Sequence, residues 1–206
     1  MKKIIVITEP QFIENEVTVV ESLFEAGLEI LHIRKPSASL AELESFLRAI
    51  APQYLKRVVL HSHYQLMAKY NIRGIHLTSH VWEELQEQGT LKEYIRPLQK
   101  RGLSISASTH SFAEIQRLPS TLDYVFLSPF FDSISKPSYF GSINVSEVED
   151  FIFHQAKIPP IVALGGIQIN AIAALKNIGL HGVALLGTIW QADNPTAAFQ
   201  AFCRAF

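Results

Sequence analysis

Apolar residues follow two alternating patterns along this chain. Short runs rich in Val, Ile and Leu, such as residues 4–8 and 124–127, have the length and composition of buried β-strands. A longer segment follows each run, and in segments such as residues 14–26 the apolar positions recur every three or four residues. That spacing is typical of a helix with one buried face. The pattern therefore predicts a repeated strand–helix unit.

The repeat fills the chain. The predicted strands cover residues 4–8, 29–34, 58–61, 74–77, 104–108, 124–127, 161–164 and 182–186. The predicted helices cover residues 14–26, 39–54, 64–70, 82–100 with a break near Gly89, 112–118, 145–154, 172–178 and 196–206. Eight such units in about 200 to 250 residues are typical of a (β/α)8 TIM barrel, and we expect residues 1–206 to form one such α/β domain. An open doubly wound sheet is the competing architecture, but the short crossover helices favour closure.

Composition narrows the range of partners. The chain has 206 residues, of which 48% are hydrophobic, and a net charge of −1. Such a chain has no general attraction for nucleic acid or for an anionic membrane, so an anion would be bound by a local group of residues. The single cysteine, Cys203, excludes a disulfide framework and agrees with a cytoplasmic location. The apolar run at the N-terminus stops at Glu9-Pro10, too early for a signal peptide or a membrane span.

Glycines follow the last two predicted strands. In a TIM barrel the active site lies at the C-terminal ends of the strands, and the loops after strands seven and eight often bind a phosphate through backbone N–H groups. Gly165-Gly166 follows the seventh strand and Leu186-Gly187-Thr188 ends the eighth. Because glycine has no Cβ, phosphate oxygens can approach the backbone closely. These loops predict a phosphate site, and the alternative is that Gly165-Gly166 only turns the chain.

Basic residues end the second predicted strand. His32 and Arg34 point to the same face, and Lys35 begins the following loop. A guanidinium can hold a phosphate through two parallel hydrogen bonds, although an ion pair with a carboxylate would engage the same group. These three residues are therefore candidates for substrate binding.

The loop after the sixth predicted strand, residues 128–136, combines hydroxyls with a lysine. Ser133 and Ser135 point the same way in an extended segment, and Lys136 is next to them. Two hydroxyl donors and an ammonium group suit an anionic oxygen cluster, and the alternative is a solvated turn.

The eight histidines raise the question of a metal site. His61 and His63 would point the same way in an extended segment, as two zinc ligands would. No acidic residue stands near them in the sequence, so histidines satisfied by hydrogen bonds are the preferred interpretation and no metal ligand is assigned. Ser108 and His110 suggest a hydrolase dyad, but no nucleophile elbow or orienting carboxylate accompanies them.

Several of these stretches together resemble the thiamin phosphate synthase and thiazole tautomerase superfamily over nearly the whole chain. Residues 127–136 are similar to its G-P-x-F-x-T-x-T-K loop, with Ser133 and Ser135 in place of the threonines and Lys136 retained. The other similar segments are residues 74–77 to D-G-V-H-L, 105–111 to I-G-x-S-x-H-S, 162–167 to V-A-I-G-G-I, and 32–34 to the strand that carries the substrate arginine.

The resemblance implies a barrel that joins a hydroxymethylpyrimidine diphosphate to a thiazole phosphate and releases diphosphate, assisted by Mg²⁺. It implies small phosphorylated substrates, and it makes Lys136, His110 and Ser108 the candidates for catalysis. By position, the residues that would contact the substrates are Gly166, Gly187 and Thr188 at the thiazole phosphate, Arg34, Ser108 and Lys136 at the diphosphate, and Ser133 and Ser135 between the two.

The chain departs from the family pattern at the magnesium site. Ser62 stands where the first metal-binding acid is found, and Val81 or a neighbour stands where the second is found. Mg²⁺ would then depend on diphosphate oxygens for its ligands. Coupling is the leading expectation because the hydroxyl–hydroxyl–lysine loop is retained. The alternatives are a thiazole tautomerase with His110 or His32 as proton carrier, or a non-catalytic barrel that binds a phosphate ligand. The oligomeric state is open, with a homodimer as one option.

Overall fold

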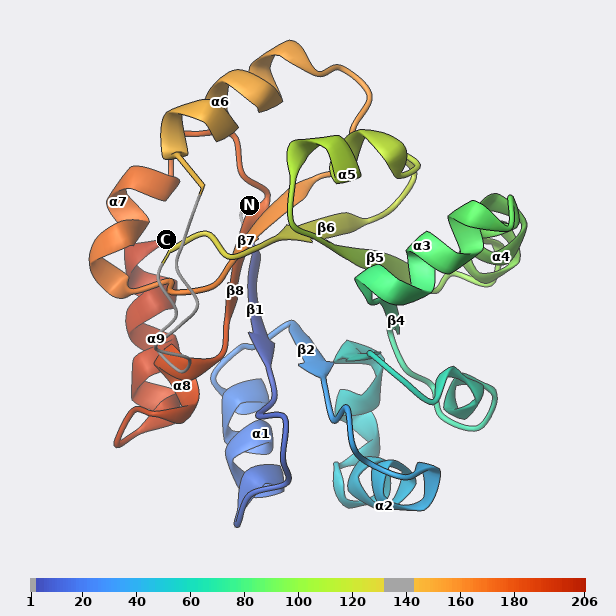
Figure 1. Ribbon diagram of the computed structural model, residues 1–206. Coiled ribbons are helices and arrows are strands. Elements are labelled where there is room, and N and C mark those ends of the chain that lie inside the picture. Colours follow the sequence, from blue (N-terminus) through green and yellow to red (C-terminus); the bar gives the residue numbers. More distant parts are fainter. Residues whose placement is uncertain (1–2, 132–142) are drawn as a thin grey trace.

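Eight parallel strands form a closed barrel in the computed structural model, which describes residues 3–131 and 143–206. The strands are β1 (Lys3–Ile7), β2 (Ile30–Ile33), β3 (Val58–Leu60), β4 (Gly74–Leu77), β5 (Ser104–Thr109), β6 (Tyr124–Leu127), β7 (Ile161–Leu164) and β8 (Gly182–Leu185). Each strand pairs with the next in sequence, and β8 pairs with β1 through a register that opposes Leu185 to Val6 (Figure 1). The predicted (β/α)8 barrel is confirmed.

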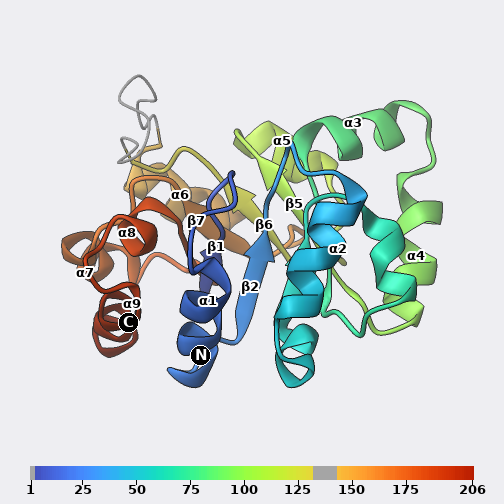
Figure 2. The same cartoon turned by 90° about the horizontal axis from the view of Figure 1, so that it is seen from below.

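Helices surround the strands (Figure 2). They are α1 (Glu16–Glu25), α2 (Leu40–Ala49), α3 (Ser79–Glu87), α4 (Leu91–Lys100), α5 (Phe112–Arg117), α6 (Val145–His154), α7 (Ile172–Leu175), α8 (Gly187–Trp190) and α9 (Pro195–Ala205), with 3₁₀ turns η1 (Pro52–Arg57), η2 (Tyr64–Ala68) and η3 (Ile169–Ala171). Among the described residues, no helix combines the length and the apolar character needed to cross a membrane.

The helix expected over residues 39–54 is divided in two. Its start is well defined, because the Ser39 side chain accepts from the backbone of Glu42 and the Glu42 carboxylate accepts from the backbone of Ser39. The helix ends before Ile50, whose ψ of 133° is extended. Pro52 follows shortly after, and it disfavours helical geometry for the residue before it. A 3₁₀ turn therefore connects α2 to β3.

Strand alternation separates two apolar layers. Val6 points outward and belongs to the large core between strands and helices, whereas Ile5 and Ile7 point into the barrel. The inner apolar layer consists of Ile5, Ile7, Ile30, Val59, Tyr124, Phe126, Val162 and Ala184. Polar residues are also buried among the strands, and they include His32, His76 and Ser106.

Glycine permits close strand contact at two places in the barrel. A Cβ added at Gly74 would lie 1.8 Å from the carbonyl oxygen of Ser104, and one at Gly182 would lie 2.0 Å from the carbonyl oxygen of Lys3. Real carbon–oxygen contacts do not reach these distances, so the β4–β5 and β8–β1 pairs require glycine.

We expect Gly74→Ala to lower the free energy of unfolding by about 3 kcal/mol or more, because the neighbouring strand must move away from the new methyl group. Gly102→Ala is the matched control: Gly102 has a φ of +79°, but a Cβ there would meet no atom within 4 Å. Its cost should be only the backbone strain, about 1–2 kcal/mol. Urea unfolding of both variants gives the comparison, and equal losses would mean that the strand contact is not the reason for Gly74.

Candidate active site

A cavity of about 470 Å³ opens at the C-terminal ends of the strands. All eight strands or the loops that follow them contribute to its wall. Representative lining residues, in strand order, are Glu9, Arg34, His61, Thr78, Ser108, Ser128, Gly165 and Gly187. This is the end of the barrel at which TIM-barrel enzymes carry out their chemistry.

The two predicted glycine loops line the same cavity. Gly165 and Gly166 have φ values of 102° and 64°, in the left-handed region that favours glycine. Gly187 begins the short helix α8, and the Thr188 hydroxyl donates to the carbonyl oxygen of Ile167 at 2.5 Å. This bond connects the loop after β8 to the loop after β7. Leu186 also lines the cavity, so both glycine loops bring backbone to it. Phosphate binding by their N–H groups stays a prediction.

Three further predicted site residues line this cavity: Arg34, Ser108 and His110. The backbone N–H of Arg34 donates to the Thr8 hydroxyl at 3.0 Å, which holds the end of β2 against the end of β1. The exposed His110 ring places Nδ1 2.8 Å from the carbonyl oxygen of Ser128, at the end of β6. The cavity therefore combines one guanidinium with hydroxyl and imidazole groups.

The residues Ser133, Ser135 and Lys136 lie outside the described residues. The segment that leads to them is described, and it starts beside the glycine loop after β7. The backbone N–H groups of Phe130 and Phe131 donate to the carbonyl oxygens of Leu164 and Gly165, at 2.9 and 3.0 Å. The chain thus leaves β6 along the cavity wall, where Ser128 and Pro129 line it.

Lys35 faces away from the cavity, which corrects the prediction that it binds substrate. Its side chain is buried, and Nζ lies 2.7 Å from a carboxylate oxygen of Glu16 and 2.7 Å from the carbonyl oxygen of Gln11. The ammonium also lies 4.7 Å from the centroid of the Phe12 ring. Burial lowers the pKa of Lys35, while Glu16 opposes that shift. This ion pair connects α1 to the end of β2 and has a structural role.

His32 lies beneath the cavity and is not among the residues that line it, so the predicted contact with substrate is also corrected. The ring is fully buried. Its Nδ1 is 2.8 Å from Nε2 of His61, and its Nε2 is 2.6 Å from the Tyr124 hydroxyl. Strand alternation correctly placed His32 on the inner face with Arg34, but two residues along a strand separate the mouth of the barrel from its interior.

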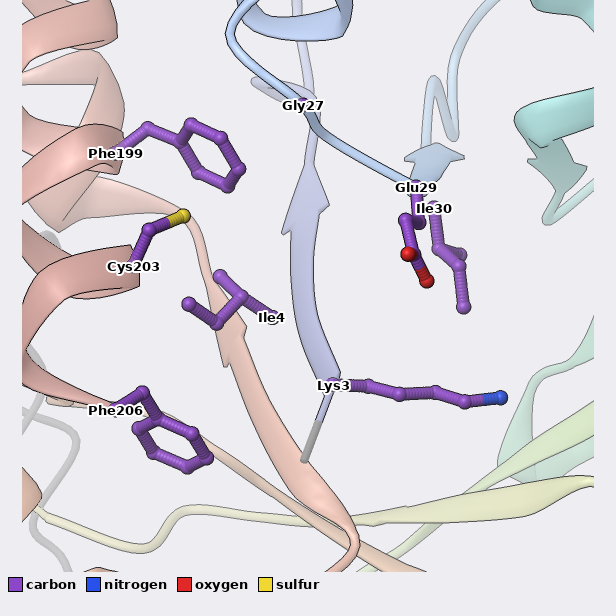
Figure 3. Close-up of a pocket in the computed structure, with 8 residues that line it drawn as sticks. All are labelled: Lys3, Ile4, Gly27, Glu29, Ile30, Phe199, Cys203 and Phe206. Carbon is purple, nitrogen blue, oxygen red and sulfur yellow. The ribbon is translucent and has the colours of Figure 1, made fainter. Parts of the chain in front are cut away.

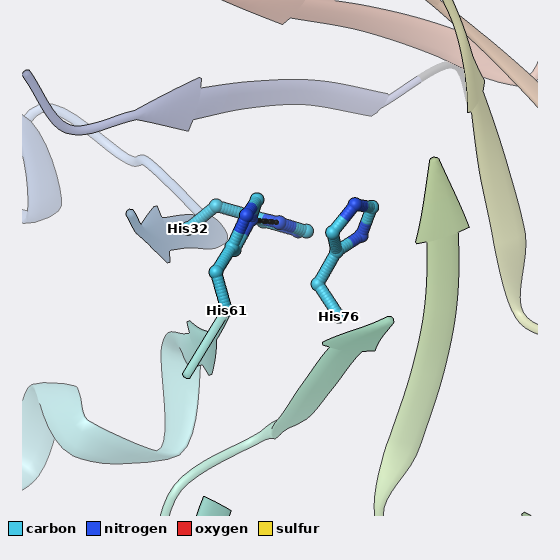
Figure 4. Close-up of side chains that lie close together, drawn as sticks. All are labelled: His32, His61 and His76. Carbon is cyan, nitrogen blue, oxygen red and sulfur yellow. Dashed lines mark hydrogen bonds between the residues drawn. The ribbon is translucent and has the colours of Figure 1, made fainter. Parts of the chain in front are cut away.

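His32, His61 and His76 form a cluster in the barrel interior (Figure 4). One ring nitrogen from each lies within 4.8 Å of the others. The rings of His61 and His76 stack with centroids 4.2 Å apart, and His76 is bonded through Nδ1 to Ser106 and through Nε2 to Ser108, both at 2.8 Å. Of this cluster, His61 reaches the cavity wall.

His61 and His63 do not point the same way, and each ring is hydrogen bonded to a different residue, as the preferred interpretation of the histidines expected. Strand β3 ends at Leu60, and His63 has a left-handed φ of 51°. Its ring therefore turns away and bonds to the carbonyl oxygen of Ala38 at 2.8 Å. The residues that His61 does contact, His32 and His76, come from other strands, and strand register also places His76 in β4 opposite its partner Ser106 in β5. Polar residues at inward positions of otherwise apolar strands could have indicated this group.

The histidine cluster is uncharged at neutral pH. Burial lowers the pKa of His32 and of His61 well below 6.5, and it lowers the pKa of His76 to about 3. The Arg34 guanidinium adds a smaller effect of the same sign on the pKa values of His61 and His76. A closed barrel cannot solvate an imidazolium, so these rings act as neutral donors and acceptors.

Carboxylates are scarce around the cavity. Among the described residues that line it, Glu9 is the only acid. At the end of β3, the Ser62 hydroxyl is buried and finds no hydrogen-bond partner in the described part of the chain. Val81, in α3, packs its side chain against the apolar core. Mg²⁺ prefers carboxylate oxygens, so the residues at the ends of β3 and β4 do not fit a magnesium ion held by the protein.

A second cavity, of about 240 Å³, lies at the opposite end of the barrel (Figure 3). Helix α9 contributes Phe199 and Cys203 to its wall, Phe206 follows that helix, and β1 contributes Lys3 and Ile4. The lining is mainly apolar. Because the N-terminal end of a TIM barrel serves stability, we assign this cavity to the scaffold.

Comparison with known proteins points to one family. A sequence model of the family described as thiamine monophosphate synthase matches residues 4–189. The thiamine-phosphate synthase of Proteus mirabilis is 27% identical over 186 residues, which cover 85% of this chain and 79% of that protein. The crystal structure of thiamine phosphate pyrophosphorylase from Bacteroides thetaiotaomicron superimposes with a TM-score of 0.76 at 28% identity, covering 98% of this chain and 96% of that one. The Pyrococcus furiosus structure of the same description also has a TM-score of 0.76, but at 19% identity it supports the fold alone.

We expect acid to destabilise the protein through the buried cluster of His32, His61 and His76. Below pH 6.5 the unfolded chain takes up protons on His32, His61 and His76 before the folded protein does, so stability is lost as the pH falls. The loss is up to about 1.4 kcal/mol per pH unit for each histidine. Urea unfolding from pH 7.5 to 4.5 measures the slope, which His76→Gln should reduce by roughly one histidine's share. A flat profile would contradict the burial of neutral rings.

Proposed function

The chain belongs to the thiamine monophosphate synthase family, and we propose that it joins a hydroxymethylpyrimidine diphosphate to a thiazole phosphate with release of diphosphate. The observation that carries this proposal is the shared cavity: the two glycine loops and Arg34 line one space of about 470 Å³. Two anionic groups can thus be held at two places in the same cavity, as a reaction between two phosphorylated substrates requires.

The glycine loops would hold the thiazole phosphate. The N–H groups around Gly166 and Gly187 can donate to phosphate oxygens at close range. Because the hydroxyl of Thr188 already donates to Ile167, the two loops are held together before a ligand arrives. A preorganised site of this kind does not need to reorganise when it binds the anion.

Arg34 and Ser108 would hold the diphosphate. In the proposed reaction the bond between the pyrimidine methylene carbon and the diphosphate oxygen breaks, and the thiazole nitrogen forms a new bond to that carbon. Negative charge grows on the departing diphosphate, where the Arg34 guanidinium stabilises it. We assign the same role to Lys136, with Ser133 and Ser135 between the substrates, on the family resemblance.

The floor of the cavity suits the cationic fragment of the same reaction. His61 lines the cavity and is uncharged, because burial lowers its pKa well below 6.5. Phe126 lines it too. Neutral rings do not repel the pyrimidine cation that forms when diphosphate leaves, whereas imidazolium groups would.

Magnesium carries no step of this mechanism. If Mg²⁺ takes part, the substrate's diphosphate oxygens would supply most of its ligands, with Glu9 as the carboxylate at the cavity wall. We also propose a cytoplasmic location, in keeping with the unpaired Cys203, and small phosphorylated molecules as the partners. A homodimer stays a prediction.

The second candidate function is thiazole tautomerisation. Ser62, and Val81 or a neighbour, stand where the coupling reaction's metal would find its acids, whereas an isomerase needs no such site. His110 lines the cavity and could carry a proton.

Arg34→Ala should weaken the binding of the diphosphate substrate by about 2 kcal/mol, because one charge-assisted contact is lost. That loss corresponds to a rise of roughly 30-fold in KM. Arg48→Ala removes an arginine whose side chain is 67% exposed and should leave KM unchanged. A coupled assay with both substrates and Mg²⁺ measures thiamin phosphate formation. If the unmodified protein forms no thiamin phosphate, coupling is rejected.

Lys136→Ala should also weaken diphosphate binding, and it should shift the free energy of unfolding by less than about 0.5 kcal/mol, because residues at a strand mouth are seldom part of the core. Calorimetric titration with inorganic diphosphate and urea unfolding of the same preparation test the two statements. A strongly destabilised variant would show that the lysine is structural.

A further inference from the structure

A third cavity, of about 550 Å³, lies at the N-terminal ends of β4, β5 and β6, at the end of the barrel opposite the candidate active site. We call it the basal cavity. Arg73 precedes β4, Ser104 begins β5, and Thr121 and Asp123 precede β6. Helix α4, which lies beside β5 (Figure 1), contributes Gln99. Small-molecule sites occupy roughly 300–1,000 Å³, so the basal cavity is large enough for a ligand.

The basal cavity contains a guanidinium that the protein leaves incompletely paired. The Nε atom of Arg73 is buried and has no hydrogen-bond partner among the described residues. None of the ion pairs in the described part of the chain includes Arg73. A buried donor without a partner destabilises a folded protein, so packing alone does not account for an arginine at this position.

The backbone holds Arg73 in a fixed place. Its N–H donates to the carbonyl oxygen of Val58 at 2.8 Å, and its own carbonyl oxygen accepts from the N–H of Ser104 at 2.9 Å. Arg73 is therefore bonded on one side to the start of β3 and on the other to the start of β5. A side chain that begins from so rigid a frame needs little reorganisation to meet a ligand.

The charge in the basal cavity is positive, although the chain as a whole has a net charge of −1. Lys56 lines the cavity together with Arg73. Asp123 is the one acid among the described residues that line it, and its Oδ2 already accepts from the backbone N–H of Ile105 at 2.8 Å. The two cations therefore exceed the available acid, and an anion would find a local attraction there.

A neighbouring cavity of about 360 Å³ extends the positive surface along α4. It shares Gln99 and Thr121 with the basal cavity, and the Gln99 side-chain amide donates to the carbonyl oxygen of Thr121 at 2.6 Å. This cavity adds Lys92 and Arg96, and its described lining contains no acid. The positive charge thus continues beyond the basal cavity.

We propose that the basal cavity binds a small molecule through a phosphoryl group. Such a group has three strong acceptor oxygens and a charge of about −1.5 to −2 at pH 7, which balances two cations. Arg73 can bind two of its oxygens through the guanidinium fork. Lys56, the Asn71 amide and the hydroxyls of Ser104 and Thr121 supply further donors around the same space. A carboxylate carries one charge and two oxygens, so it would use this set of donors less completely.

The basal cavity and the candidate active site can be filled at the same time, because they lie at opposite ends of the strands. Binding at the basal cavity therefore does not depend on the proposed coupling reaction. Inorganic phosphate and a phosphate ester share the chemistry that the basal cavity recognises, and only a direct comparison of the two ligands can identify which one it holds.

Backbone amide ¹H–¹⁵N NMR separates the two ends of the barrel in one titration. Inorganic phosphate should shift the signals of Asn71 and Thr121 with a Kd of about 1 mM or tighter. Glycerol phosphate is the second probe, and the tighter of the two identifies the source. No saturable shift at these amides would mean that water satisfies the guanidinium, and the proposal would be overturned. Acetate that binds there as well as phosphate would overturn the phosphoryl assignment.

The same spectra distinguish a failure here from a failure of the proposed function. Gly166 and Gly187 report on the candidate active site. Shifts at these glycines alone would overturn the basal site and leave the proposed function standing. Shifts at Asn71 and Thr121 alone would support the basal site while the predicted phosphate site of the glycine loops fails.

Arg73→Gln should weaken phosphate binding at Asn71 and Thr121 at least about tenfold, because the charge-assisted fork is lost. Lys56→Gln should weaken it in the same direction. Arg101→Gln is the matched control: it removes the same charge from an exposed arginine nearby that does not line the basal cavity. Equal weakening by Arg101→Gln would show general attraction to a basic surface and no built site.

Urea unfolding in phosphate-free buffer tests whether Arg73 belongs to the scaffold. Because its Nε has no partner among the described residues, Arg73→Gln should leave the unfolding midpoint unchanged. Added phosphate should then stabilise the unmodified protein more than this variant. A clear loss of stability in Arg73→Gln without phosphate would show that the guanidinium is structural, and it would overturn the proposal.

Discussion

A polar group inside a closed barrel must find its partner inside the barrel, and this constraint organises the interior of the protein. His32, His76 and Tyr124 lie where water has no access, so an unpaired nitrogen or hydroxyl there would lose its hydrogen bonds with water and gain nothing. Each of these side chains is paired with another that faces inward: His76 with Ser106 of the neighbouring strand β5, and His32 in β2 with Tyr124 in β6 across the barrel. Burial keeps the rings neutral, and their neutrality determines what chemistry the cavity above them can support.

The cavity consequently has two parts with different electrostatics. Its rim offers the Arg34 guanidinium and the backbone N–H groups of the glycine loops, which suit phosphate oxygens. Its floor offers His61 and Phe126, which carry no charge. A substrate with an anionic tail and a reacting heteroaromatic ring matches this division. The proposed coupling would use the rim to stabilise the departing diphosphate.

The same constraint explains a buried ion pair near the site. Lys35 and Glu16 are both buried, and each charge would be costly alone. Together they bring α1 against the end of β2, with the Gln11 carbonyl as a third partner. A lysine adjacent to Arg34 in sequence therefore belongs to the scaffold, because successive side chains point to opposite faces of a strand. Arg34 keeps its place at the cavity because this neighbour is engaged elsewhere.

Much of the architecture could be predicted because it depends on local pattern. The periodicity of apolar residues predicted strands at 124–127 and 161–164 and a helix at 145–154, and these bounds are those of β6, β7 and α6. Glycine chemistry marked the loops after β7 and β8, which do line one cavity. The pattern could not show how far each inward-facing side chain lies below the mouth of the barrel. Alternation indicates that His32 faces inward, but whether it lies at the mouth or in the interior depends on how far neighbouring strands are staggered.

The sequence by itself determined the eight strand–helix units, the inward face of each strand and the polar residues available at the strand ends, because those features follow from the spacing of residues along one segment. The tertiary structure alone decided that His61 meets His32 and His76 and not His63, that Lys35 pairs with Glu16, and that Tyr124 bonds to His32. These contacts join residues 15 to 92 positions apart. Their geometry is set by barrel closure and by the register of adjacent strands, which no single segment encodes.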